Sequence, residues 1–134
     1  MTATYTTEHV AELVGVPYST LAQWAAEGLI DVKRGRSKRD GYSWTAKHVY
    51  EAKVMADMRG LEVPLQLMRK AMKFLRTRGH NPFSTGTYLV IRRESGKGSR
   101  RIEALIKVCD SGELIEIAGK GRGQYVLPLF EGSR

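Results

Sequence analysis

Five positive side chains stand within seven consecutive positions, in the stretch VKRGRSKRDGYSW of residues 32–44. They are Lys33, Arg34, Arg36, Lys38 and Arg39, and the 31 residues before position 32 contain no Lys or Arg. Lysine and arginine bind phosphate oxygens, and arginine also enters a narrow minor groove of DNA. The stretch therefore predicts contact with a polyanion, and a solvated charged loop is the alternative.

The charge of the whole chain agrees with this prediction. The chain has 134 residues, a formal net charge of +8 and a hydrophobic content of 42%. That length corresponds to one domain or two very small ones, and the hydrophobic content is sufficient for a core. A strongly positive balance favours nucleic acid over a membrane surface as the partner. Charge that serves only solubility is the alternative.

Other kinds of site are disfavoured by the residues present. The single cysteine, Cys109, rules out an intrachain disulfide and a cysteine-rich zinc site, and the three histidines are far apart in sequence. We therefore expect no metal and no cofactor. The sequence contains no signal peptide and no apolar run approaching 18 residues, so we expect a cytoplasmic, nucleoid-associated protein. No catalytic constellation of Ser, His, Cys or paired carboxylates stands out, so we predict that it is not an enzyme.

Residues 5 to 79 have the periodicity of helices. The first helix is predicted from a Thr6 cap to Val14, before Gly15, with an apolar face of Val10, Leu13 and Val14. A short turn, Val16–Ser19, leads into a second helix that runs to about Glu27, with Leu21, Trp24 and Ala25 on its inner face. This close spacing is typical of a helix-turn-helix motif.

Two further helices are predicted, and the basic stretch lies before them. One runs from a Thr45 cap through Met58, and Gly60 ends it. The other opens at Pro64, and Gly79 follows it. The basic stretch is too rich in glycine, serine and charge for a helix, and its two ends carry residues that suit a strand, Val32 at the start and Tyr42 and Trp44 at the end. We predict a two-stranded hairpin with a basic tip, which in a helix-turn-helix protein is called a wing.

After residue 79 the pattern changes to that of a sheet. We predict strands at TYLVIRR, IEALIKV, LIEIA and YVLPL, with a hairpin turn at Asp110–Glu113 and the last strand at an edge because Pro128 cannot donate. The predicted turns of this sheet contain Lys and Arg residues, which we expect either to protect the sheet edges from aggregation or to add contacts with DNA. A sheet this small is marginal alone, so we expect it to pack on the helices or on a second copy. The predicted fold class is α+β, with domains at 1–79 and 80–134.

Four blocks in the first half resemble the MerR-type winged helix-turn-helix. They are YTTEHVAELVGV, STLAQWAAEGLI, GYSWTAKHV and MRGLEVPLQLMRKAM, and they occur in the order and at the spacing of that family over about residues 5–78. The resemblance implies four helices plus a hairpin wing, a recognition helix in the major groove, and double-stranded DNA as the partner. The long dimerising helix of the family is replaced here by the strand-rich half.

The predicted recognition helix departs from the family pattern. Ala22 stands where the family usually has arginine, so this helix offers no positive charge. The side chains expected to contact DNA are therefore polar ones, Tyr18, Ser19, Thr20 and Gln23, together with the basic stretch and Tyr42. Glutamine can bind adenine in a bidentate manner, and hydroxyls can bind bases or phosphates. The alternatives are capping for Ser19 and Thr20, solvation for Gln23, and packing on the turn for Tyr18.

Three functions remain open. The first is a repressor or autoregulator of a bacterial or phage promoter, acting as a homodimer through the β region on paired half-sites. The second is an antitoxin, because a MerR-like motif joined to a β region also resembles the N-terminal part of certain bacterial antitoxins, which hold a toxin protein. The third is an excisionase-like architectural protein that bends DNA. The absence of a sensor segment disfavours a metal- or drug-responsive regulator.

Overall fold

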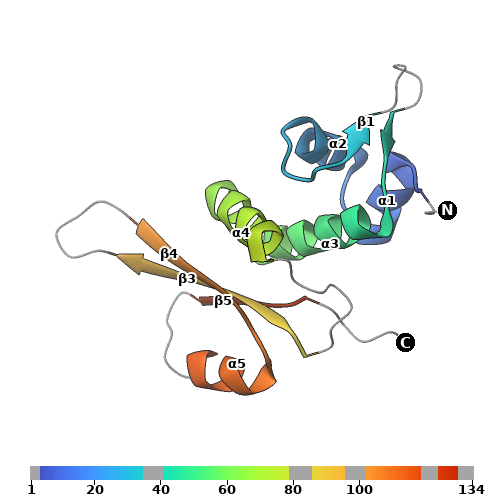
Figure 1. Ribbon diagram of the computed structural model, residues 1–134. Coiled ribbons are helices and arrows are strands. Elements are labelled where there is room, and N and C mark those ends of the chain that lie inside the picture. The colour runs from blue at the N-terminus through green and yellow to red at the C-terminus, as the bar shows by residue number, and fades with distance from the viewer. Residues whose placement is uncertain (1–3, 35–40, 79–85, 96–101, 119–123, 130–134) are drawn as a thin grey trace. The chain divides into compact units, whose positions relative to one another are not determined.

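Five helices and five strands follow one another in the residues that a computed structural model describes, namely 4–34, 41–78, 86–95, 102–118 and 124–129 (Figure 1). The helices are α1 (Thr7–Val14), α2 (Tyr18–Ala26), α3 (Ala46–Gly60), α4 (Leu65–Arg78) and α5 (Ser111–Ala118). The strands are β1 (Lys33–Arg34), β2 (Tyr42–Ser43), β3 (Tyr88–Ser95), β4 (Ile102–Cys109) and β5 (Gln124–Pro128). The fold is thus α+β with a small antiparallel sheet, as predicted.

The sequence signals at both ends of α1 act as expected. The backbone N–H of His9 donates to the Thr6 hydroxyl oxygen at 3.2 Å, which satisfies one of the free donors at the helix start. Gly15 ends the helix with φ of 75°, a left-handed conformation that glycine adopts without strain. The predicted inner face needs one correction, because Leu13 is 56% exposed and Ala11 is buried in its place.

Helix α1 is the element around which the first compact unit, Met1–Gly60, is arranged. It contacts both α2 and α3. The buried apolar side chains of the unit include Val10 and Ala11 of α1, Leu21, Trp24 and Ala25 of α2, and Ala52, Met55 and Met58 of α3, and on α2 and α3 these have helical spacing. Burial of such apolar faces is the main source of stability for helices this short.

Strands β1 and β2 form an antiparallel pair between α2 and α3. Lys33 pairs with Ser43 and Arg34 pairs with Tyr42. The pair is tied to the start of the chain by Trp44, which exchanges backbone hydrogen bonds of 2.8 and 3.1 Å with Tyr5. The base of this β1–β2 pair is therefore fixed by main-chain bonds to the segment just before α1.

The second compact unit, Leu61–Arg134, contains an antiparallel sheet with strand order β4-β3-β5. The central strand β3 buries three consecutive residues, Leu89, Val90 and Ile91, so both of its faces are covered. Helix α4 contacts β4, and α5 contacts β3 and β4. Strand β5 lies at an edge of the described sheet, as Pro128 predicts.

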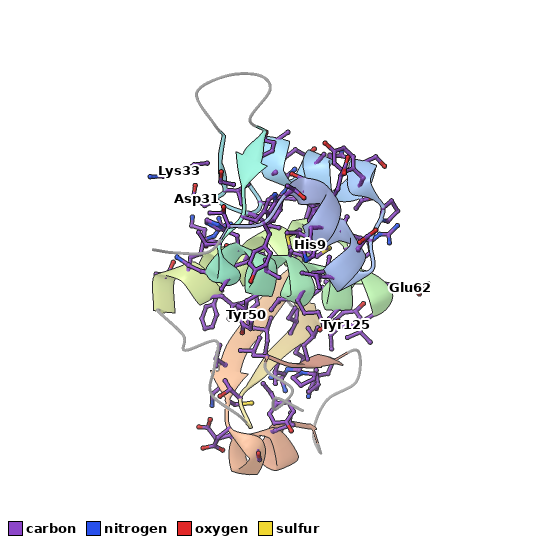
Figure 2. All side chains as sticks on the ribbon, turned by 90° about the vertical axis from the view of Figure 1, so that its right-hand side faces the viewer. His9, Asp31, Lys33, Tyr50, Glu62 and Tyr125 are labelled. Atoms are coloured by element: carbon purple, nitrogen blue, oxygen red, sulfur yellow. The ribbon has the colours of Figure 1, made fainter. Side chains whose placement is uncertain are left out.

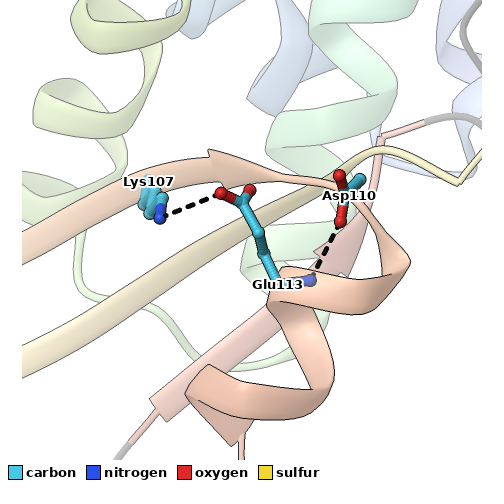
Figure 3. Close-up of polar contacts among 3 residues, drawn as sticks. All are labelled: Lys107, Asp110 and Glu113. Atoms are coloured by element: carbon cyan, nitrogen blue, oxygen red, sulfur yellow. Dashed lines mark hydrogen bonds and ion pairs between the residues drawn. The ribbon is translucent and has the colours of Figure 1, made fainter.

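One predicted strand is wrong, because residues 111–118 form helix α5. The Asp110 carboxylate accepts a hydrogen bond of 2.9 Å from the backbone N–H of Glu113, three residues on (Figure 3). That bond caps a helix, so the predicted hairpin turn at Asp110–Glu113 is instead a helix start. The apolar run that follows is short enough to fit a strand or a helix, and the cap with the adjoining sheet selects the helix.

The compact units meet in sequence at Gly60 and Leu61, whereas the sequence predicts functional domains at 1–79 and 80–134. Compactness and function need not divide a chain at one point, so the predicted domain boundary stays a prediction. Between α3 and α4, Glu62 adopts a left-handed conformation with φ of 60°.

Candidate nucleic-acid interface

The N-terminal turn of α2 is open to solvent and carries no acidic residue. Pro17 occupies the cap position with φ of −60° and makes no side-chain cap bond. Ser19 and Thr20 therefore lie within the first turn and do not cap the helix. Tyr18 is 54% exposed, Ser19 is exposed and Thr20 is partly exposed. Uncapped N–H groups at a helix start favour negative charge, so this end of α2 suits phosphate or a base acceptor.

Gln23 lies one turn after Ser19 on the same exposed side of α2. Its side-chain Nε2 donates to the Glu27 carboxylate at 3.2 Å. The contact uses one hydrogen of the amide and leaves the second hydrogen and the carbonyl oxygen, which are the two groups that bind adenine. Glu27 is not among the residues predicted from the sequence, although residues four positions apart on a helix are neighbours and can share a hydrogen bond.

The two tryptophans near the interface are core residues, as the sequence predicts for Trp24. Trp24 is 5% exposed and Trp44 is fully buried. The indole N–H of Trp44 donates to the hydroxyl oxygen of Thr7 at 3.0 Å, and both side chains are buried. This bond joins the β1–β2 pair to α1, so Trp44 positions the basic stretch without offering a contact surface of its own.

Part of the basic stretch lies in the described β1–β2 pair. Lys33 is exposed and its side chain extends away from the ribbon (Figure 2), and Tyr42 on the facing strand is half-buried. The register places Arg34 opposite Tyr42. Arg36, Lys38 and Arg39 lie outside the residues that the structure describes. The first two cations and Tyr42 are thus brought together, and the other three remain sequence-based candidates.

The face of α1 beside Tyr18 has the opposite charge. Glu8 and Glu12, with Ala11, Val16 and Tyr18, line a shallow hollow of about 380 Å³. Carboxylates repel phosphate, so this hollow does not suit the DNA backbone. Any phosphate contact of Tyr18 must therefore be made on the side away from α1.

Other classes of site have little support in the described part of the chain. There, no three His, Cys, Asp or Glu residues are grouped so that they could hold a metal ion. None of the described helices is long and apolar enough to cross a membrane.

Tyr50 of α3 is the described tyrosine whose pKa is shifted. Burial raises that pKa, and the Glu51 carboxylate raises it further, because both disfavour the charged phenolate.

Comparison with known proteins assigns a family to this arrangement of helices. A family described as MerR HTH family regulatory protein matches residues 5–75, which is more than half of the 134-residue chain. A comparison with curated proteins found no match. The match covers α1, α2, the β1–β2 pair, α3 and most of α4, and it confirms the resemblance predicted from the sequence. The chain therefore belongs to the MerR helix-turn-helix family, whose members are DNA-binding regulators of transcription that act on double-stranded DNA.

Proposed function

We propose that this protein represses or autoregulates a bacterial or phage promoter as a winged helix-turn-helix regulator. Helix α2 enters the major groove, and the β1–β2 pair with its basic loop forms a wing over the phosphates or in the minor groove. The observation that carries the proposal is the open N-terminal turn of α2, with Tyr18 and Ser19 exposed and Gln23 on the same side. It acts by binding, without catalysis, at the nucleoid.

Helix α2 and the proposed wing differ in charge, and we infer different contributions to DNA binding from that difference. The side chains of α2 that face solvent are neutral, and the residue that follows the helix is Glu27, so this helix contributes hydrogen bonds and little attraction. The wing carries Lys33, Arg34, Arg36, Lys38 and Arg39. Phosphate contacts supply much of the affinity for DNA, and base contacts supply the choice of sequence. We therefore assign affinity chiefly to the wing and sequence preference to α2.

A single module of this size contacts few base pairs, which favours a homodimer. Two copies related by a two-fold axis bind half-sites separated by one helical turn or a multiple of it. The β region of residues 80–134 is the proposed dimerising part, because the family's usual dimerising helix is absent from this sequence.

The decisive experiment is selection of bound sequences from random DNA, followed by a footprint of the strongest binder. Two related half-sites at one or two helical turns, overlapping a promoter, are the expected result. A footprint of several adjacent copies with strong bending would indicate the excisionase-like alternative. Co-purification of a small toxin partner that alters DNA binding would indicate the antitoxin. Absence of any enriched sequence would contradict a sequence-specific regulator.

A further inference from the structure

Strand β4 provides the better of the two edges of the sheet for pairing with another strand. Its eight residues, Ile102–Cys109, pair with β3 on one side, and no strand lies on the other side in the described part of the chain. The opposite edge, β5, has five residues and ends at Pro128, which has no N–H. An edge strand exposes a row of unpaired N–H and C=O groups and is a template for another strand.

The sequence of β4 is self-complementary about Leu105. Glu103 and Lys107 stand two positions to either side of it, with Ala104 and Ile106 between. When two copies of such a strand run antiparallel with Leu105 opposite Leu105, position 103 of each copy faces position 107 of the other. Glu103 of each copy then faces Lys107 of the other, and Ala104 faces Ile106. This is the charge complementarity that a two-fold pairing requires.

The register within one copy adds a second reason for a partner. Glu103 is the direct register partner of Glu94 on β3, so two acidic residues occupy facing positions of the sheet. Like charges directly opposite each other destabilise an antiparallel pair. In the two-fold pairing, Lys107 of the second copy stands in the same row and supplies a positive charge beside the two acids.

Lys107 has a contact in the single copy, and it is a weak one. Its Nζ lies 3.5 Å from the Glu113 carboxylate in α5, and the two side chains are 46% and 48% exposed (Figure 3). Exposed pairs of this kind contribute little to stability. Lys107 can therefore turn toward, or share its charge with, an acid on a neighbouring copy at low cost.

We propose that β4 pairs antiparallel with β4 of a second copy, centred on Leu105. The two three-stranded sheets then join into one sheet of six strands, and the apolar positions of β4 at Ile102, Ala104, Ile106 and Val108 continue across the junction. The proposal deepens the proposed function and rests on it in one respect, the homodimer through the β region. The occupant of the edge is a second copy of this chain.

Charge exchange tests the pairing in solution. In Glu103→Lys, a lysine at position 103 of each copy faces Lys107 of the other. In Lys107→Glu, a glutamate at position 107 of each copy faces Glu103 of the other. We expect each variant to raise the dimer dissociation constant roughly ten-fold or more, measured by sedimentation over a range of concentrations. An equimolar mixture of the two variants regains the opposite charges, and so does the double variant E103K/K107E, so both should dimerise like the unaltered protein. Circular dichroism confirms that each variant is folded.

The results that would overturn the pairing are equally clear. They are an unaltered protein that is monomeric throughout the concentration range, single variants that dimerise normally, and a mixture that stays dissociated. Each of these outcomes leaves no function for opposite charges at positions 103 and 107.

Disulfide cross-linking tests the centre of the pairing by a different measurement. Directly opposite residues in antiparallel strands have Cα atoms about 4.5–5.5 Å apart, which a disulfide can bridge. Leu105→Cys should therefore form a covalent dimer on mild oxidation. Val108→Cys is the matched control, because it keeps Glu103 and Lys107 and because positions 108 of the two copies would lie about 20 Å apart. Both variants carry Cys109→Ala, which removes a native thiol that is buried and whose pKa burial raises. Equal cross-linking of the two variants, or none of Leu105→Cys, would contradict the register.

DNA binding by the same variants separates this proposal from the proposed function. Glu103→Lys should keep its affinity for one half-site and lose the additional affinity for paired half-sites. If the unaltered protein dimerises through β4 but selects no DNA sequence, the regulator proposal fails and the pairing stands. If it selects DNA while the charge variants still dimerise, the pairing fails and the regulator proposal stands.

Discussion

The side chain of Gln23 illustrates how a neighbouring residue changes what a sequence-based candidate can do. In the structure its amide donates to Glu27. That contact limits the rotation of an otherwise exposed side chain, which lowers the entropy lost when it binds a base. In the proposed complex, the same contact would place a carboxylate near the DNA, where it repels phosphate. Glu27 therefore favours orientation of Gln23 and disfavours non-specific affinity.

Gln23→Ala should change sequence preference more than total affinity. A bidentate contact with adenine contributes about 1–3 kcal/mol of discrimination against the wrong base, and alanine removes it. The measurement compares affinities for the selected site and for the same site with single base changes. Gln66→Ala, an exposed glutamine of α4, is the control and should leave the preference unaltered. Identical relative affinities in both variants would show that Gln23 does not contact bases.

Thr7 stabilises the first unit through a bond that crosses 37 positions of the chain. Thr7→Val keeps the shape of the side chain and leaves the buried indole N–H of Trp44 without this acceptor. We expect a loss of about 1–3 kcal/mol in the free energy of unfolding, measured with urea. The same substitution at Thr77, whose exposed hydroxyl donates to the Lys73 carbonyl, should change stability by less than about 0.5 kcal/mol. Equal losses at both sites would argue against this bond.

At the scale of the elements, the β1–β2 pair and the basic residues between its strands can be tested by removing their charge. Replacing Arg34, Arg36, Lys38 and Arg39 by alanine should weaken binding to every duplex. It should also lower the slope of log affinity against log salt by up to about 3.6, at about 0.9 for each phosphate contact. Stability should change by less than about 0.5 kcal/mol, because surface substitutions have small effects.

A control separates this local effect from a general loss of charge. Lys70→Ala with Lys73→Ala removes two exposed positive charges from α4, a helix that is not among the elements proposed to contact DNA. The salt slope of that double variant should be unchanged. If the salt slope falls in proportion to the number of lysine and arginine side chains removed, wherever they lie, the wing has no specific function in binding.

Helix α5 begins at a cap that a single substitution can test. Asp110→Ala removes the acceptor of the Glu113 N–H and should lower stability by about 0.5–2 kcal/mol. Asp57→Ala removes a carboxylate from the exposed 2.9 Å pair with Lys53 and should cost about 0.3–0.5 kcal/mol. Denaturant unfolding of both variants provides the comparison. If Asp110→Ala costs no more than Asp57→Ala, the cap is not what selects the helix.

At the scale of the whole molecule, dimerisation should couple to stability. Association that requires the folded state makes the thermal midpoint rise with protein concentration. We expect such a rise for the unaltered protein and for E103K/K107E, and a smaller rise over the same range for Glu103→Lys alone. Calorimetry over a hundred-fold range of concentration measures it. A midpoint of the unaltered protein that does not depend on concentration would argue against a dimer that forms only between folded chains.

Much of the first half followed from the sequence because its signals are local. Thr6 and Gly15 mark the ends of α1, and helical spacing selects the inner faces of α2 and α3. In the second half, Pro128 marks an edge strand by the same kind of local signal. Caps, turns and amphipathic faces depend on residues a few positions apart, so they can be inferred before the fold is known. The same local pattern carries the MerR family match and hence the DNA-binding function.

Tertiary structure decided what depends on residues far apart or on competing local preferences. The run LIEIA fits a strand or a helix, and the Asp110 cap and contacts with β3 and β4 make it helical. Leu13 has the spacing of an inner residue, yet the packing of α1 leaves it exposed. The position of β4 at an edge, which gives its symmetric charges a possible partner, depends on strand order, and strand order is not encoded in any short stretch. Local chemistry thus determined the DNA-binding half, and long-range pairing determined the surface through which two copies are proposed to meet.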